Sequence, residues 1–183
     1  IMKVIYSDLK NKRVFISGGG SGIGATIVEY FCEQKSEVYF IDIDIKSSNK
    51  LIKNIKKKGF KIPKFIECNI LDVKKLQNII KDIISKKGSI NCLINSAAND
   101  DRHTTEQVDE KYWENRMGIN LKHYFFAAQA VVKGMKKIKS GSIVNLSSVS
   151  WMLGEGDKVV YETAKSAVVG LTRSFAQEFG KYN

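Results

Sequence analysis

The stretch SGGGSGIG, residues 17–24, lies between a short apolar run, RVFIS at 13–17, and a helical pattern that begins near residue 22. Glycines in such a turn let backbone N–H groups approach a pyrophosphate at the N-terminus of the following helix, where unpaired donors and the positive end of the helix dipole lie. Glycine-rich stretches are common in loops and alone say little about function. The position of this one, directly after a strand and at the start of a helix, makes it a specific signal of dinucleotide binding. It predicts a dinucleotide-binding turn formed by Ser17, Gly18, Gly20, Ser21, Gly22, Ile23 and Gly24.

Strand-like and helix-like segments alternate along the whole chain. The predicted strands are apolar nearly throughout, as expected when both sheet faces are covered: RVFIS (13–17), EVYFID (37–42), KFIEC (64–68), INCLIN (90–95) and SIVNLS (142–147). Helical patterns run from about 22 to 35, 46 to 58, 72 to 84, 106 to 139 and 157 to 180. Such alternation predicts an α/β fold, a doubly wound parallel sheet of the Rossmann type, as a single domain over residues 1–183.

The composition is that of a globular protein with a basic surface. The net charge is +11, but the lysines are scattered and only four of the 30 basic residues are Arg. Lysines scattered over solvent-exposed surfaces explain this charge better than a nucleic-acid-binding function does. A protein that binds nucleic acid would be expected to carry more Arg to contact phosphates. Three cysteines without C-x-x-C spacing and two distant histidines predict free thiols and no metal site. The absence of a signal pattern and of a long apolar run predicts a soluble, cytoplasmic protein without a membrane partner.

Ligands of doubly wound sheets bind beyond the carboxyl ends of the strands, so the residues there are functional candidates. Asp42 ends the second strand 18 residues after Gly24 (42 − 24). Its carboxylate can accept both hydroxyls of an adenine ribose and would repel a 2′-phosphate, and this predicts NAD as the cofactor. Asp44 is a rival that lies two residues further along.

The third and fourth strand ends add weaker candidates. Asn69, followed by Ile70, could hydrogen-bond the adenine or be a plain loop residue, and the two readings stay open. At NSAA (95–98), the small residues Ser96 and Ala97 would permit close approach of the cofactor. Asn95 either contacts the ligand or holds neighbouring strands through side-chain to backbone bonds.

The fifth strand end brings catalytic chemistry. It ends in Ser147–Ser148, and a helix that begins beyond it would carry Tyr161 and Lys165 on one face, one turn apart. Tyr-x-x-x-Lys spacing is common by chance in so lysine-rich a chain, and Tyr6 with Lys10 is a second instance. Only the later pair follows a strand end, so context selects Tyr161.

Together these motifs resemble the short-chain dehydrogenase/reductase family. The family pattern is a T/S-G-x-x-x-G-x-G turn, an N-N-A-G strand end, a serine and Y-x-x-x-K, and the resemblance covers the whole chain. It implies four catalytic residues: Asn120 as a helix-kinking Asn, Ser148, Tyr161 as the base and Lys165 as its partner. The chain departs from the pattern at Ser96 and Ala98, and Asn69 replaces a more usual Asp.

A narrower resemblance links the chain to bacterial D-xylose and related aldose 1-dehydrogenases of this family. It rests on NDDRH (99–103), YWENRMGINLKH (112–123), SVSWMLG (148–154) and VYETAK (160–165). It implies an NAD-dependent oxidation at C1 of an aldose such as D-xylose, giving an aldonolactone. Asn99 and Trp151 are hypothesised to line the sugar site, although Trp151 is equally explained as a core aromatic. Asp100, Arg102 and His103 would alternatively form a salt-bridge network in their loop.

The implied chemistry follows from charge. The Lys165 ammonium and an oxidised nicotinamide both favour a Tyr161 phenolate, which would take the anomeric proton as C1 loses its hydride. Ser148 would hold the reacting oxygen. The Asn120 carboxamide, or the backbone it frees, would seat a water that relays the proton from Lys165.

Family members are longer, so the resemblance implies C-terminal strands and a substrate lid that are missing from these 183 residues. The helical regions 106–139 and 157–180 lie where such enzymes pair, and this predicts a homodimer or homotetramer. Two alternatives remain open: a reductase of another carbonyl such as a 3-oxoacyl thioester, and a non-catalytic dinucleotide- or nucleic-acid-binding module. Asp42 argues against the first, because biosynthetic reduction generally uses NADPH.

Overall fold

The computed structural model describes residues 4–182 and contains one five-stranded sheet whose paired strands are all parallel. The strands are β1 (Arg13–Ser17), β2 (Glu37–Asp42), β3 (Lys64–Glu67), β4 (Cys92–Asn95) and β5 (Ser142–Asn145). Their spatial order is β3-β2-β1-β4-β5, so the direction of winding reverses between β1 and β4. The predicted parallel sheet is confirmed, with the last three strands shorter than predicted by one or two residues.

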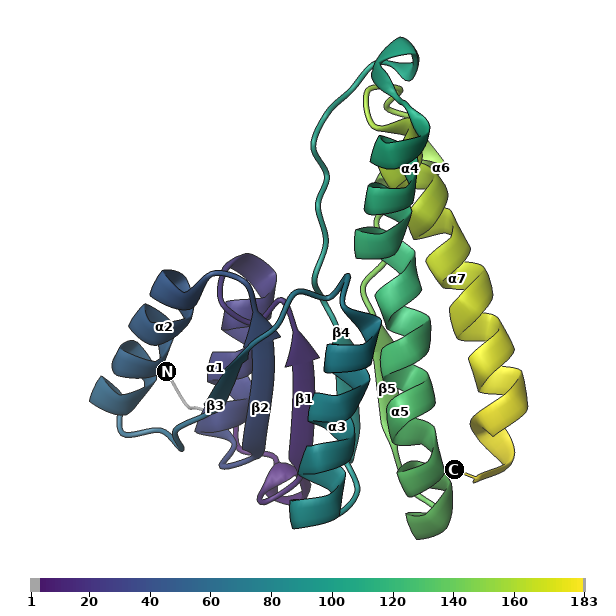
Figure 1. Ribbon diagram of the computed structural model, residues 1–183. Helices are drawn as coiled ribbons and strands as arrows, with labels where there is room; N and C mark the ends of the chain where they lie inside the picture. Colours follow the sequence, from purple (N-terminus) through teal and green to yellow (C-terminus); the bar gives the residue numbers. More distant parts are fainter. Residues whose placement is uncertain (1–3, 183) are drawn as a thin grey trace.

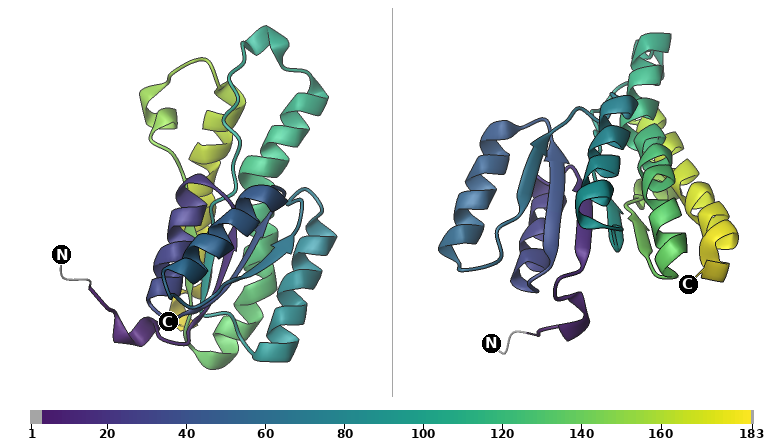
Figure 2. Two further views of the ribbon diagram at one scale, coloured as in Figure 1. Left: turned by 90° about the vertical axis from the view of Figure 1, so that its left-hand side faces the viewer. Right: turned by 60° about the horizontal axis from the view of Figure 1, so that its bottom comes forward.

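Helices cover both faces of the sheet (Figures 1 and 2). They are α1 (Gly22–Glu33), α2 (Ile45–Lys57), α3 (Val73–Lys87), α4 (Glu110–Met117), α5 (His123–Ile138), α6 (Ser150–Leu153) and α7 (Val159–Phe179). Residues of α1 and α2 pack against one face, and those of α3 and α5 against the other. The longest helix, α7, stands beside α5 (Figure 1).

The helical pattern predicted from about 106 to 139 is not one regular helix, and its interruption includes Asn120, where the resemblance implies a kink. A 3-10 turn at Thr105–Gln107 precedes α4, and a π-helical turn at Gly118–Lys122 joins α4 to α5. The wider turn leaves some backbone carbonyls without their usual i+4 donor, and it is centred on Asn120. The short helix α6 was not predicted, because four residues carry no readable periodicity.

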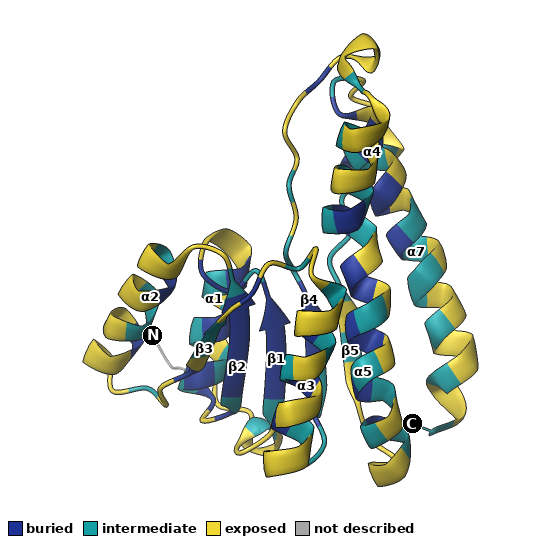
Figure 3. Ribbon diagram, in the orientation of Figure 1, coloured by how far each residue is buried: buried dark blue, intermediate teal, exposed yellow. Residues whose placement is uncertain are grey.

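Strand alternation sends side chains of β1 into two separate cores. Phe15 packs with α3 and α5, whereas Val14 and Ile16 pack with α1 and α2. The central strands are buried on both faces, while the helices expose their outer sides (Figure 3). The edge strand β5 is less covered, and its Val144 is 41% exposed.

The start of α3 behaves as its sequence indicates. Asp72 is the N-cap, and its Oδ1 accepts a hydrogen bond from the Lys75 backbone N–H at 2.8 Å. The predicted apolar stripe then buries Leu76, Ile80 and Ile83 against the sheet. The cap satisfies one of the helix's unpaired donors while the stripe supplies the packing energy.

All three cysteines are free thiols, as predicted, with Cys32 and Cys68 buried and Cys92 partly buried. Burial raises the pKa of Cys32 to about 12 and that of Cys92 to about 11, so both are protonated at neutral pH. Among residues 4–182, no three His, Cys, Asp or Glu side chains come together as a metal-binding group. No helix in that same range has both the length and the apolar character to cross a membrane.

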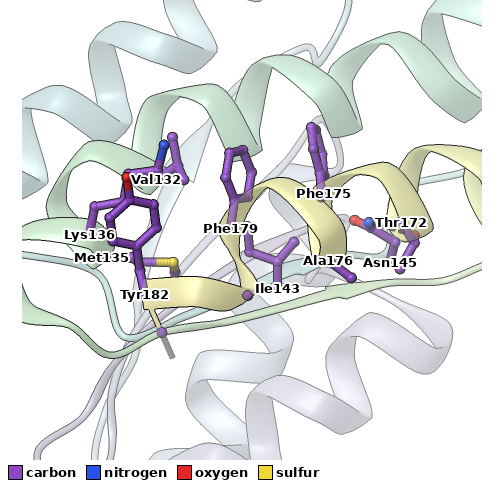
Figure 4. Close-up of a pocket in the computed structure, with 12 residues that line it drawn as sticks. Val132, Met135, Lys136, Ile143, Asn145, Thr172, Phe175, Ala176, Phe179 and Tyr182 are labelled. Carbon is purple, nitrogen blue, oxygen red and sulfur yellow. Dashed lines mark hydrogen bonds between the residues drawn. The ribbon is translucent and has the colours of Figure 1, made fainter.

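An apolar pocket of about 200 Å³ lies between α5, β5 and the end of α7 (Figure 4). Three aromatic side chains, Phe175, Phe179 and Tyr182, are part of its wall, and the rings of Phe175 and Phe179 are stacked with centroids 5.2 Å apart. Its lining includes Ile143 and Asn145 of β5 and residues of the C-terminal part of α7. None of the predicted functional residues lines this pocket, although Asn145 accepts a hydrogen bond from Asn95 Nδ2.

Candidate active site

A cavity of about 670 Å³ opens at the carboxyl ends of the strands, next to the point where the winding reverses. This is where doubly wound sheets bind ligands. Its lining comes from the ends of the five strands and the loops after them, from the start of α1, from the π-helical turn and from α7: Gly18, Ser21, Gly22, Ile23, Gly24, Asp42, Ile43, Asp44, Cys68, Asn69, Ile70, Ser96, Ala97, Ala98, Asn99, Asp100, Ile119, Leu146, Ser147, Tyr161 and Lys165. Thirteen of the predicted site residues are in this set.

The glycine turn has the geometry that a dinucleotide needs. Gly18 has φ +68°, and a Cβ there would lie 2.8 Å from the Ala97 backbone nitrogen. A Cβ on Gly24 would lie only 1.9 Å from the Gly18 carbonyl oxygen, so the helix can start this close to the turn only with glycine. Ser21 is the N-cap of α1 but makes no side-chain capping bond. These residues therefore fit a pyrophosphate at the start of α1.

Asp42 connects the turn to the second strand. Its Oδ2 accepts a hydrogen bond from the Gly20 N–H at 2.8 Å, and its Oδ1 accepts one from the Asp44 N–H at 2.9 Å. Asp44, the rival candidate, caps α2 by accepting from the Ser47 N–H at 2.9 Å, and hydrogen bonding by the side chain and then the backbone of Ser47 lowers the pKa of Asp44. Both carboxylates border the cavity, but only Asp42 is bonded to the glycine turn.

Three predicted cofactor residues support the cavity without lining it. Buried Ser17 accepts hydrogen bonds at its Oγ from the backbone N–H groups of Ser96 and Ala97, at 3.1 and 3.3 Å. Gly20 donates to Asp42. Asn95 donates from Nδ2 to Asn145 Oδ1 at 2.8 Å and so joins β4 to β5, through a side-chain to side-chain bond rather than the side-chain to backbone bond expected above. These bonds fix the first, second, fourth and fifth strand ends relative to each other.

Asn69 and Asn99 line the cavity but use one side-chain atom locally. Asn69 Oδ1 accepts from the Leu71 N–H at 3.0 Å, and Asn99 Oδ1 accepts from the Asp101 N–H at 2.9 Å. Each carboxamide therefore stabilises its own turn and keeps its NH₂ group for another partner.

Tyr161 and Lys165 lie on one face of α7 and both border the cavity, with the Lys165 Nζ 5.5 Å from the centroid of the Tyr161 ring. Lys165 is 1% exposed, so its aliphatic chain and amine are withdrawn from water. Burial lowers the pKa of Lys165 to about 8. Tyr6, the second tyrosine at this spacing, is exposed and ahead of β1.

Ser148 lies just outside the cavity lining, in the loop between β5 and α6. Its Oγ is 2.8 Å from Ser150 Oγ and accepts from the Ser150 N–H at 3.2 Å. Its neighbour Ser147 donates to the Lys165 carbonyl oxygen at 2.7 Å and so is occupied in holding α7. Within residues 4–182, no hydrogen bond joins Ser148 to Tyr161, and the role of Ser148 stays a prediction.

Asn120 has both halves of its carboxamide engaged. Oδ1 accepts from the Asn99 N–H and Nδ2 donates to the Asn99 carbonyl oxygen, each at 2.9 Å. The carboxamide oxygen keeps a second acceptor site and the NH₂ group a second donor, so the role of Asn120 in seating a water stays a prediction. Asn120 thereby ties the loop after β4 to the turn between α4 and α5.

The loop after β4 is held against the start of α7 by His103. His103 Nδ1 lies 2.9 Å from the Tyr112 hydroxyl, and Nε2 accepts from the Val160 N–H at 3.3 Å. Arg102 pairs with Asp157, so Arg102 and His103 belong to the loop network that was the alternative to a sugar site. Asp100 instead borders the cavity. Trp151 is in α6 and does not border it, so its substrate role also stays a prediction.

Two neighbouring residues of the site escaped the sequence analysis, His123 and Tyr124 at the start of α5. His123 Nε2 lies 3.3 Å from Ser17 Oγ, and the Tyr124 hydroxyl lies 2.8 Å from the Lys165 Nζ. Both are fully buried. His123 and Tyr124 lie in an apolar helical stripe, and that pattern predicts only that they are part of the core. No spacing in the sequence relates them to Ser17 or Lys165.

We expect replacement of Gly24 by Ala to weaken dinucleotide binding by at least about tenfold, because the new Cβ would displace the Gly18 carbonyl and with it the turn. Fluorescence titration with a reduced nicotinamide dinucleotide measures this. Gly170→Ala in α7 is the matched control, since a Cβ there meets nothing within 4 Å. Equal affinities in the two variants would contradict the assignment of the turn.

His123 makes the fold sensitive to acid. Burial, aided by the Lys165 charge, lowers the pKa of His123 from 6.5 to about 3, so below pH 6.5 the unfolded chain binds a proton that the folded chain does not. We expect this group to lower the free energy of unfolding by about 2 kcal/mol between pH 7 and pH 5. Urea unfolding of the wild type and of His123→Asn at both pH values measures the difference. The variant should lose less stability on acidification, and equal losses would refute the expectation.

Comparison with known proteins agrees with this geometry. A family model described as short chain dehydrogenase matches residues 12–183. D-xylose 1-dehydrogenase of Caulobacter vibrioides is 42% identical over 177 residues, covering 96% of this chain and 69% of that protein. The probable galactose dehydrogenase GalD of Rhizobium meliloti is 38% identical, covering 97% of this chain and 70% of that protein.

Among solved structures, the ligand-free aldohexose dehydrogenase of Thermoplasma acidophilum matches with a TM-score of 0.84 at 29% identity, over 97% of this chain and 65% of that chain. A putative short-chain alcohol dehydrogenase from Sinorhizobium meliloti matches with a TM-score of 0.87 at 27% identity, over 95% and 69%. This chain thus spans about two thirds of the length of these relatives. It belongs to the short-chain dehydrogenase family, oxidoreductases that use a nicotinamide dinucleotide.

Proposed function

We propose that this protein oxidises C1 of an aldose, a pentose such as D-xylose, with NAD as the hydride acceptor, and releases an aldonolactone. The observation that carries the proposal is that Tyr161 and a buried Lys165 face the same cavity as the glycine turn. The 42% and 38% identical relatives, named as D-xylose and galactose dehydrogenases, support a sugar as the substrate.

The chain's own groups account for the proton in this reaction. The Lys165 ammonium, 5.5 Å from the Tyr161 ring, favours the phenolate, which accepts the proton of the anomeric hydroxyl. Ser148 donates a hydrogen bond to the same oxygen as it changes from alcohol to carbonyl. A bound NAD supplies the acceptor for the hydride that leaves C1. Loss of one hydride and one proton from a cyclic hemiacetal gives the lactone.

Asn99 and Trp151 are proposed to contact the sugar. Asn99 borders the cavity, and its NH₂ group is left for a sugar hydroxyl because its Oδ1 is bonded within its own turn. Trp151 follows Ser148 by three residues in α6, and its indole would pack on an apolar face of the ring.

The proposal is tested by following the absorbance of reduced nicotinamide while the protein is mixed with NAD or NADP and a panel of pentoses, hexoses and simple alcohols. We expect turnover with NAD and an aldose. Tyr161→Phe should lower kcat by at least about 100-fold, since it removes the general base, and leave dinucleotide affinity largely intact. Tyr6→Phe, the same change at the exposed tyrosine of the second Tyr-x-x-x-Lys pair, should change neither kcat nor dinucleotide affinity. A parallel assay follows the oxidation of NADPH in the presence of a 3-oxoacyl thioester, and turnover in that assay alone would contradict the sugar proposal.

The choice of NAD depends on the charge of Asp42. Asp42→Asn retains an oxygen that can accept from the Gly20 N–H but removes the negative charge that would repel a 2′-phosphate. We therefore expect the ratio of kcat/KM for NAD to that for NADP to fall by about tenfold or more, mainly through a lower KM for NADP. Steady-state kinetics with both cofactors gives the ratio. An unchanged ratio would show that another group selects the cofactor.

A further inference from the structure

The Lys165 amine has two protein partners, and neither is the tyrosine four residues before it. Nζ donates to the Tyr124 hydroxyl oxygen at 2.8 Å and to the Leu146 carbonyl oxygen at 2.7 Å. Tyr124 comes from the first turn of α5, and Leu146 follows β5. The amine is therefore held where three parts of the chain meet.

The Tyr124 hydroxyl is fixed as tightly as the amine. It donates its own proton to the same Leu146 carbonyl oxygen at 3.1 Å while accepting from Lys165. The carbonyl thus accepts from both donors, and the three groups form a closed triangle. Tyr124 is fully buried, so water does not compete for its oxygen. With its proton directed to Leu146, the hydroxyl is left to act as an acceptor toward Lys165.

The charges around the amine are few. The titratable groups that face it are Tyr124 and His123 from α5 and Tyr161 from α7. His123 is neutral, because burial and the Lys165 charge hold its pKa near 3. In the part of the chain that the structure describes, Lys165 takes part in no ion pair. Oxygen acceptors, rather than a carboxylate, are therefore what keep a proton on this buried amine.

We propose that Tyr124 is a positioning residue of the active site, whose hydroxyl, together with the Leu146 carbonyl, holds the Lys165 amine in its charged form beside the Tyr161 ring. A neutral phenol suits this task better than a carboxylate would. A carboxylate would neutralise the ammonium and cancel its effect on Tyr161, whereas a phenol oxygen stabilises the charge without cancelling it.

Removal of this oxygen should act on Tyr161 through Lys165. In Tyr124→Phe, the ammonium loses one of its two protein acceptors while its burial stays the same, so the pKa of Lys165 falls below its wild-type value. A larger fraction of the amine is then neutral at a given pH. A neutral amine no longer favours the Tyr161 phenolate, so the base forms only at higher pH.

The first measurement needs no substrate. Lysine amines are acetylated with a trace of acetic anhydride across a pH series, and the Lys165 peptide is quantified by mass spectrometry. We expect the midpoint of Lys165 labelling to lie at lower pH in Tyr124→Phe than in the wild type. Tyr39→Phe is the matched control, since it removes a buried hydroxyl that bonds Glu37 in β2, and its Lys165 midpoint should equal that of the wild type.

The second measurement rests on the proposed function. The pH profile of kcat/KM for aldose oxidation should move in the opposite direction, with its rising limb at higher pH, and activity at pH 7 should fall by about tenfold in Tyr124→Phe but not in Tyr39→Phe.

If no sugar is oxidised by any variant, the proposed function fails while the labelling result still decides the role of Tyr124. An unchanged labelling midpoint would overturn the role of Tyr124, as would an unfolded Tyr124→Phe protein, because the proposal assigns the hydroxyl to Lys165 and not to the fold.

Discussion

A lysine amine withdrawn from water is the constraint around which the active end of this protein is organised. Lys165 is 1% exposed, and a buried ammonium is tolerated only where fixed oxygen atoms replace its hydration. The Leu146 carbonyl and the Tyr124 hydroxyl supply those atoms, from the end of β5 and the start of α5. The position of α7 and the rotation of α5 are therefore coupled, and Tyr161 is carried to the cavity by the same coupling.

Asn120 and Ser17 extend this coupling to the other strand ends. Asn120 binds both backbone polar groups of Asn99, which holds the loop after β4 against a π-helical turn. Ser17 accepts from the backbone of Ser96 and Ala97, and so holds the same loop against the glycine turn. Each of these side chains is conspicuous as a functional candidate in the sequence, yet each acts by joining two segments. The cavity is shaped by residues that do not border it.

Much of the fold was predictable because its signals are local. Apolar runs of strand length, glycines at the first strand end and the cap at Asp72 depend on near neighbours in the chain, and the parallel sheet followed from their alternation. The errors have local causes as well. The π-helical turn at 118–122 interrupts one helical stripe without changing its apolar pattern, so periodicity alone predicted one helix and only the resemblance implied a kink at Asn120.

The candidate site likewise has a part that local sequence signals predict and a part that depends on tertiary packing. The sequence by itself determined which residues follow the strands, because a parallel sheet must bring its carboxyl ends to one edge, and this placed Gly18, Asp42 and Tyr161 together. Only the tertiary structure decided what surrounds the Lys165 amine, since Tyr124 is 41 residues away and reads as one more core aromatic. Hydrogen-bond direction depends on how helices are rotated against each other, and that rotation is set by packing over the whole sheet rather than by any spacing along the chain.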